Sequence, residues 1–112
     1  MKNKVIPTEF FITRFKKLKR KFPSLINEVN ELEKSLLENP HIGINLGANL
    51  FKIRLASKSK GAGKSGGFRV ITFLVEESKN GFNIFLITIY DKSSESNIPK
   101  KMLLELVKEI LS

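Results

Sequence analysis

Basic side chains supply the part of this sequence that is best suited to chemistry. Lys52 and Arg54 alternate along one predicted strand, and Arg69 opens the next predicted strand. A guanidinium binds phosphate oxygens in pairs, and a lysine near other cations can act as a base because like charges disfavour its charged form. Tyr90 and Lys92 follow at the end of a later strand, where either could donate a proton. Together these residue types predict a basic patch that could contact phosphate. For Tyr90, a core anchor and an active-site stacking platform are both plausible.

A glycine-rich basic loop separates the first two of these strands. Its donors to phosphate would be backbone amides and four side chains: Lys58, Lys60, Lys64 and Ser65. The run Gly63-Lys64-Ser65 ends like a nucleotide-binding phosphate loop. That motif needs a glycine at position 58 and a following helix, and here Lys58 and a predicted strand stand in their place. We therefore predict phosphate contacts without nucleotide binding; the alternative is a flexible surface hairpin.

Net charge points to a polyanionic partner. The chain carries a formal charge of +9, and the excess lies in residues 1–22 and 52–69. Such concentration is typical of nucleic-acid binding. Within the first segment four residues of a predicted helix could contact a large RNA: Lys16, Lys17, Lys19 and Arg20. The alternative for these residues is an ordinary solvated helix face.

Residue types that are absent exclude several kinds of site. The sequence has no cysteine and one histidine, His41. A disulfide framework, a zinc ribbon, a thiol nucleophile and a two-histidine ribonuclease mechanism are thereby excluded. We expect no metal and no cofactor, and we interpret His41 as a loop or helix-end residue. No apolar run is long enough to cross a membrane, so we expect no membrane partner. The lack of cysteine suits a reducing cytosol.

Periodicity predicts one α+β domain over residues 1–112. A short strand at 4–6 precedes a helix at 8–21 and a second helix that starts at 25 and ends before 39, which form a helical hairpin. Strands are predicted at 50–57, 68–75 and 82–90, a loop at 41–49, and a final helix from Pro99. We expect an antiparallel sheet of about four strands with the helices packed on one side.

In order along the chain, several segments resemble the RelE/ParE superfamily of bacterial toxins. They are the helical hairpin, Asn39-Pro40, Lys52-Ile53-Arg54-Leu55, Ser65-Gly66-Gly67-Phe68-Arg69-Val70-Ile71 and Ile87-Thr88-Ile89-Tyr90-Asp91-Lys92. The resemblance spans about residues 5–110 and looks closest to the HigB-type branch. It implies a RelE-like fold and a bacterial cytoplasmic toxin of a type II toxin–antitoxin module. Such a toxin cleaves messenger RNA, usually on the ribosome, inhibits translation, and is silenced by a cognate antitoxin.

The resemblance also implies roles for individual residues. Lys52 and Arg54 match the paired basic residues of the family's first long strand, and Arg69 matches the arginine after the Ser-Gly-aromatic turn. Lys92 stands where the family often has a basic residue after the last strand. The family's later tyrosine or histidine has no equivalent, because Ile98 occupies that position; Tyr90 is a candidate substitute.

Two other functions remain open at this point. The protein could bind RNA without cutting it or inhibit a DNA topoisomerase, as the ParE branch implies. It could also be an inactive relative whose main partner is its antitoxin. The grouping of Lys52, Arg54 and Arg69 on neighbouring predicted strands favours the nuclease.

Overall fold

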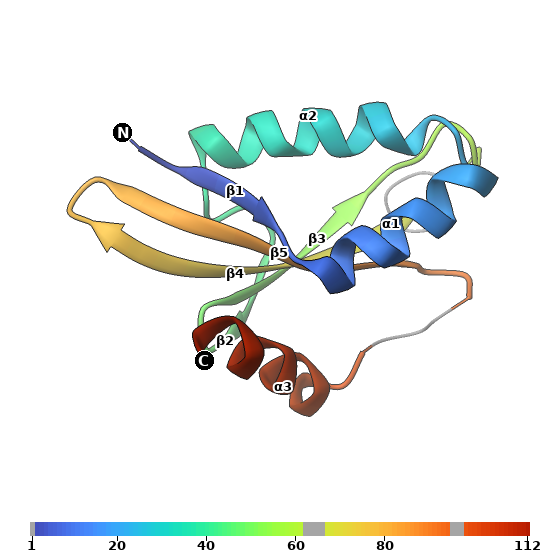
Figure 1. The fold of residues 1–112 in the computed structure, drawn as a ribbon. Helices are drawn as coiled ribbons and strands as arrows, with labels where there is room; N and C mark the ends of the chain where they lie inside the picture. The colour runs from blue at the N-terminus through green and yellow to red at the C-terminus, as the bar shows by residue number, and fades with distance from the viewer. Residues whose placement is uncertain (1, 62–66, 95–97) are drawn as a thin grey trace.

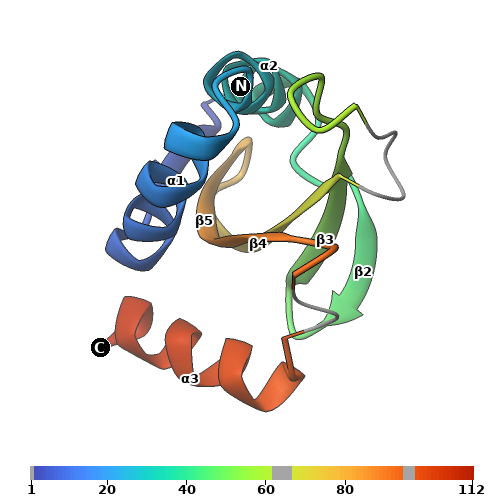
Figure 2. The same ribbon diagram turned by 90° about the vertical axis from the view of Figure 1, so that its right-hand side faces the viewer.

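A twisted sheet runs through the middle of the molecule, and helices lie on both of its faces (Figures 1 and 2). The structure is a computed structural model that describes residues 2–61, 67–94 and 98–112. Within these residues the sheet has five strands in the order β1-β5-β4-β3-β2. The strands and helices are β1 (Lys4–Pro7), α1 (Glu9–Lys21), α2 (Leu25–Glu38), β2 (Ile44–Gly47), β3 (Leu50–Leu55), β4 (Phe68–Ser78), β5 (Gly81–Asp91) and α3 (Lys100–Leu111).

The N-terminal helical hairpin forms where the sequence predicts it. Thr8 caps α1, because its hydroxyl oxygen accepts a hydrogen bond from the backbone amide of Phe11 at 3.2 Å. Pro23 follows the C-cap Phe22 and cannot donate a helical hydrogen bond, so the chain turns into α2 there. The apolar sides of α1 and α2 meet one face of the sheet in a single core.

The prediction that all helices pack on one side of the sheet is wrong. Leu103 and Val107 of α3 pack against Ile71, Ile87 and Tyr90, which form a second core on the opposite face. Figure 2 shows the sheet between α3 and the two N-terminal helices. The cause is that β4 and β5 are apolar on both faces, and strands of this kind need cover on both sides.

The α+β class is confirmed, and two strands differ from their predicted form. β2 lies inside the segment that was predicted to be a loop, and it joins β3 through Gly47, Ala48 and Asn49, all of which have positive φ angles. β1 pairs with β5 in parallel, while all other neighbouring strands are antiparallel. The β1–β5 pairing joins residues almost a whole chain apart, so local sequence patterns carry no signal for it.

Candidate functional site

Three predicted catalytic residues form a row across three neighbouring strands. Arg54 of β3 is directly opposite Arg69 of β4, and Arg69 is directly opposite Tyr90 of β5. Directly opposite residues of antiparallel strands project from the same face. Lys52 lies two residues before Arg54 and opposite Ile71, so it shares that face as well. Because Ile71 and Tyr90 belong to the second core, this is the face that carries α3.

Accessibility falls steeply along this row. Arg54 is exposed and Lys52 is half-buried. Arg69 is only 5% exposed and Tyr90 only 1% exposed. The guanidinium of Arg69 donates from Nη1 to the backbone oxygen of Phe68 at 3.2 Å. An approaching phosphate would therefore meet Arg54 and Lys52 first, with Arg69 behind them.

A small cavity next to the row is also lined by Lys100, a residue that the sequence patterns did not single out. The cavity measures about 140 Å³, and its lining includes Lys52, Tyr90 and Lys100. Lys100 begins α3, and a Cβ at Gly47 would lie 2.9 Å from its Nζ atom. Glycine at position 47 therefore leaves room for the Lys100 ammonium. Only the packing of α3 reveals this approach, because Lys52 and Lys100 are 48 positions apart.

A second cavity, which Tyr90 also lines, connects the row to α1. It measures about 260 Å³ and is lined by Arg14, Lys17, Tyr90, Asp91 and neighbouring residues. Arg14, which the sequence analysis did not select, donates from Nε to the backbone oxygen of Ile89 at 3.0 Å. Of the four selected basic residues of α1, Lys17 is thus the one at the site.

The other selected residues of α1 lie elsewhere on that helix. Lys16 and Lys19 line a separate cavity of about 310 Å³ between α1 and α2. The Lys19 ammonium lies 5.8 Å from the centre of the Phe15 ring. Arg20 is exposed. The predicted RNA-binding set of α1 therefore faces more than one direction.

Lys60 is not a free surface cation. Its Nζ atom forms an ion pair with Asp91 Oδ1 and a 3.0 Å hydrogen bond with Ser93 Oγ. The Lys60 and Asp91 side chains are 9% and 8% exposed. Burial alone would raise the pKa of Asp91, but hydrogen bonds from Lys60 and Ser93 and the charge of Lys60 outweigh it and hold that pKa below its usual value.

The remaining selected residues lie in the loops near this ion pair. Lys92 is half-buried, and its backbone amide donates to the backbone oxygen of Gly67 at 3.1 Å. A Cβ at Gly67 would collide with the backbone oxygen of Leu55, which explains a glycine at the start of β4. Lys58 is exposed. Lys64 and Ser65 lie outside the described residues.

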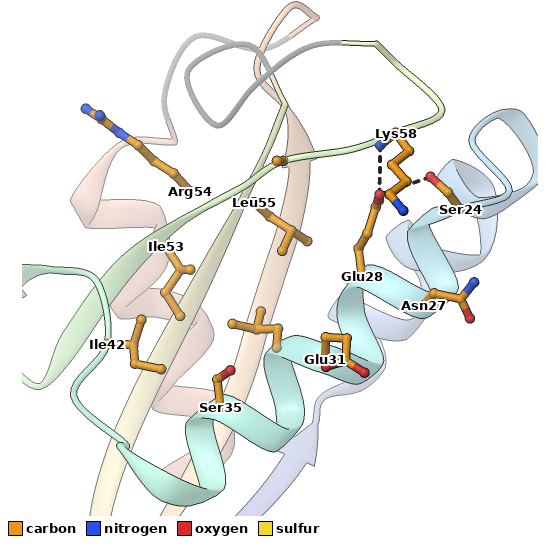
Figure 3. Close-up of a pocket in the computed structure, with 12 residues that line it drawn as sticks. Ser24, Asn27, Glu28, Glu31, Ser35, Ile42, Ile53, Arg54, Leu55 and Lys58 are labelled. Atoms are coloured by element: carbon orange, nitrogen blue, oxygen red, sulfur yellow. Dashed lines mark hydrogen bonds between the residues drawn. The ribbon is translucent and has the colours of Figure 1, made fainter.

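A larger groove lies between α2 and β3 (Figure 3). Its volume is about 490 Å³, and Leu32, Ile42, Ile53 and Leu55 contribute apolar lining. Ile53 and Leu55 point toward α2, whereas Arg54 projects away from it. The groove and the row Arg54–Arg69–Tyr90 therefore use opposite faces of the sheet.

The described residues contain no group of three or more side chains suited to hold a metal ion. His41 packs edge-on against the rings of Phe51 and Phe82, with centroid distances of 5.7 and 5.1 Å. It lies in the exposed turn between α2 and β2, in agreement with its interpretation as a loop residue. Among the described helices, none is both long enough and apolar enough to span a membrane.

A comparison with known protein families identifies the family of this chain. A family model described as RelE toxin of the RelE / RelB toxin-antitoxin system matches residues 3–110, which is nearly the whole chain. A toxin of such a system has an antitoxin as its partner. On this match, with which the α+β fold is consistent, this chain belongs to the RelE toxin family and is the toxin of a toxin–antitoxin system.

Proposed function

We propose that this toxin is a metal-independent endoribonuclease that cleaves messenger RNA on the ribosome and so inhibits translation. The observation that carries the proposal is the row Arg54–Arg69–Tyr90 with Lys52 on the same face. Like charges directly opposite each other in a sheet are unfavourable by themselves. A phosphate placed against Arg54 and Arg69 would be attracted by both guanidinium groups.

The reaction would begin with attack of the RNA 2′-oxygen on the adjacent phosphorus. Lys52 would take the proton from the 2′-hydroxyl. Arg54 and Arg69 would stabilise the added negative charge on the phosphate. The bond from phosphorus to the 5′-oxygen would break, and Lys92 or Tyr90 would protonate that oxygen. The products are a 2′,3′-cyclic phosphate and a 5′-hydroxyl.

Dependence on the ribosome is consistent with the small size of the cavities at the site. The cavities beside Tyr90 measure about 140 and 260 Å³, too little to enclose several nucleotides. A catalyst of this kind gains from a partner that already holds the substrate in a reactive geometry. Exposed cations outside the row, including Lys16, Lys19, Arg20 and Lys58, would then contact ribosomal RNA.

The antitoxin would occupy the groove between α2 and β3. The pairing of β2 with β3 ends at Lys52, so in the described residues Ile53–Leu55 have a neighbouring strand only on the β4 side. An extended segment could add along this edge and place apolar side chains in the groove. The excess positive charge of the chain as a whole would attract an acidic antitoxin.

The second candidate is a toxin that binds without cutting, whether to RNA or to a DNA topoisomerase. The burial of Arg69 and Tyr90 favours it, because a catalytic group must reach its substrate. The same RelE/ParE resemblance covers toxins of both kinds. Cleavage products distinguish the two candidates directly.

The test is induced expression in bacteria followed by primer extension on translated and untranslated transcripts. We expect wild-type toxin to cut translated regions only and Arg69→Ala to lose the cuts. Because Arg69 is buried, Arg69→Met is compared beside it, with folding checked by circular dichroism. Growth arrest without cuts would support the binding inhibitor. Undiminished cutting by folded Arg69→Met would remove Arg69 from the mechanism.

A further inference from the structure

The ion pair between Lys60 and Asp91 is buried although both residues lie in segments that lead into loops. The Lys60 ammonium lies 5.3 Å from the centre of the Phe68 ring and 5.7 Å from that of Phe22. The two rings are themselves in edge-to-face contact at 5.2 Å. A cation held between a carboxylate and two aromatic rings has little freedom to reach an external phosphate.

These contacts fasten together four separate parts of the chain. Phe22 ends α1, Lys60 belongs to the loop after β3, Phe68 begins β4, and Asp91 ends β5. Asp91 Oδ1 also accepts hydrogen bonds from the backbone amide of Ser93 at 3.0 Å and its hydroxyl at 2.8 Å. The pair therefore fixes both the loop after β3 and the turn after β5.

The catalytic candidates are the immediate neighbours of this pair. Phe68 is directly opposite Asp91, and the next pair along the two strands is Arg69 opposite Tyr90. Side chains alternate between faces along a strand, so Lys60 and Asp91 lie behind the row on the face that carries the helical hairpin. Lys92 follows Asp91 directly and is held to Gly67 by its backbone amide.

A second set of contacts, made by the two residues before Lys60, anchors the same loop to α2 and its N-cap. The backbone amide of Lys58 donates to Glu28 Oε2 at 2.8 Å, as drawn in Figure 3. The backbone amide of Ser59 donates to Ser24 Oγ at 3.0 Å. The described part of the loop is thus held at residues 58–60 by the helical hairpin and by β5.

From this geometry we propose that Lys60 and Asp91 are a pair of positioning residues. They hold the loop after β3 and the turn after β5 so that Arg69 and Lys92 keep their places in the RNA site, and Lys60 makes no contact with RNA. The inference rests on the proposed ribonuclease function. It also replaces the role of RNA contact that the sequence suggested for Lys60.

The two roles of Lys60 predict opposite effects of removing Asp91. If Lys60 bound RNA, Asp91→Asn would release its ammonium and remove a repelling carboxylate, so RNA affinity would rise. If the pair positions the site, Lys60→Met and Asp91→Asn should lower the cleavage rate by similar factors. The double variant should then lower the cleavage rate by about the same factor as either single variant, because the two residues act as a unit.

The experiment measures cleavage by purified toxin in a reconstituted translating system, giving kcat and KM for Lys60→Met, Asp91→Asn and the double variant. We expect kcat to fall roughly 100-fold with KM little changed, since a misplacement of about 1 Å has an effect of that size. Lys58→Met, an exposed lysine of the same loop, is the matched comparison and should raise KM instead. Folding is verified by circular dichroism at the assay temperature.

Two readouts are independent of cleavage. Hydrogen exchange at the amides of Lys92 and Ser93 should accelerate in both single variants and stay unchanged in Lys58→Met. Binding of a 2′-O-methyl RNA oligonucleotide should keep its salt dependence in Lys60→Met, whereas Lys58→Met should flatten the slope by about 0.7.

Higher RNA affinity of Asp91→Asn, a flatter salt slope in Lys60→Met, or unchanged exchange at Lys92 and Ser93 would each overturn the positioning role. If the wild-type toxin cuts nothing, the proposed function fails. The exchange and oligonucleotide results would still show whether the pair holds the two loops and whether Lys60 contacts RNA.

Discussion

Arg54 and Arg69 are directly opposite each other on adjacent antiparallel strands, yet Arg54 is exposed whereas Arg69 is buried, with only 5% of its surface exposed. The two guanidinium groups therefore have different tasks in the proposed reaction. Arg54 is placed to meet the substrate, and Arg69 supports the same phosphate from beneath. This division makes Arg54 the cleaner target for mutation, because its replacement leaves the core intact.

Arg54→Ala should lower the rate of mRNA cleavage about 100-fold, the size expected when one group that stabilises developing charge is removed. Its thermal unfolding should match that of the wild type. Primer extension on a translated transcript and a melting curve provide the two measurements. Lys34→Ala, which removes an exposed cation of α2, serves as the control and should cut normally. Normal cutting by Arg54→Ala would exclude Arg54 from the site.

Lys100→Ala should raise KM for the mRNA several-fold, because its ammonium lies at the cavity that Lys52 and Tyr90 also line. Gly47→Ala should also perturb the site, since the positive φ of Gly47 strains any other residue and the Lys100 Nζ atom, 2.9 Å from the new Cβ, would have to shift. Steady-state kinetics on programmed ribosomes measure both effects. Lys101→Ala, the exposed neighbour on α3, is the control. An equal effect of Lys101→Ala would show that only total charge matters.

Asp91→Asn should reduce the free energy of unfolding at neutral pH by about 3–5 kcal/mol, the range for removing one partner of a buried ion pair. The pKa of Asp91 is lowered in the folded state, so its stabilisation is present above the usual carboxyl range and is lost as the pH falls through the folded-state pKa. Urea unfolding of both proteins along a pH series should therefore show the difference shrinking on acidification.

The exposed pair Lys34–Glu31, at 3.4 Å, provides the comparison for this prediction. Glu31→Gln should change stability little at any pH, because both side chains are 74% exposed. A difference between wild type and Asp91→Asn that does not depend on pH would contradict the assignment of the stabilisation to the Asp91 carboxylate.

Replacing Lys16, Lys17, Lys19 and Arg20 together by alanine should weaken ribosome binding and flatten its salt dependence. Each phosphate contact that is lost lowers the slope of log affinity against log salt by about 0.7–0.9. Because Lys17 alone lies at the site, Lys17→Ala should also reduce kcat. Ribosome co-sedimentation at several salt concentrations measures the slope. A slope that stays at the wild-type value would identify these residues as an ordinary solvated face.

Ser35→Arg should weaken antitoxin binding without affecting cleavage, because Ser35 is exposed and lines the groove between α2 and β3. A bulky charged side chain there would block an inserted apolar segment. Titration calorimetry with the cognate antitoxin measures the affinity, and Lys34→Ala again serves as the control. Antitoxin binding at wild-type affinity would place the interface elsewhere.

The sequence alone determined the class of fold, most of the helix and strand positions, and the identity of the basic residues. Helical spacing, Thr8 as a cap and Pro23 as a break are local signals, and the structure follows them. Alternation along β3 put Lys52 and Arg54 on one face, which the register confirms. The RelE family resemblance, confirmed by the match over residues 3–110, was likewise visible in the sequence.

Only the tertiary structure decided how deeply each of these residues is buried and which groups it contacts. It buried Arg69 and Tyr90, brought Lys100 and Arg14 to the site, placed α3 on the second face of the sheet, and turned Lys60 inward to Asp91. A sequence shows the charge of a lysine but not its surroundings. Lys58 and Lys60 are two positions apart in one basic loop. Lys58 is exposed, whereas the Lys60 side chain is only 9% exposed because Asp91, Phe22 and Phe68 surround its ammonium.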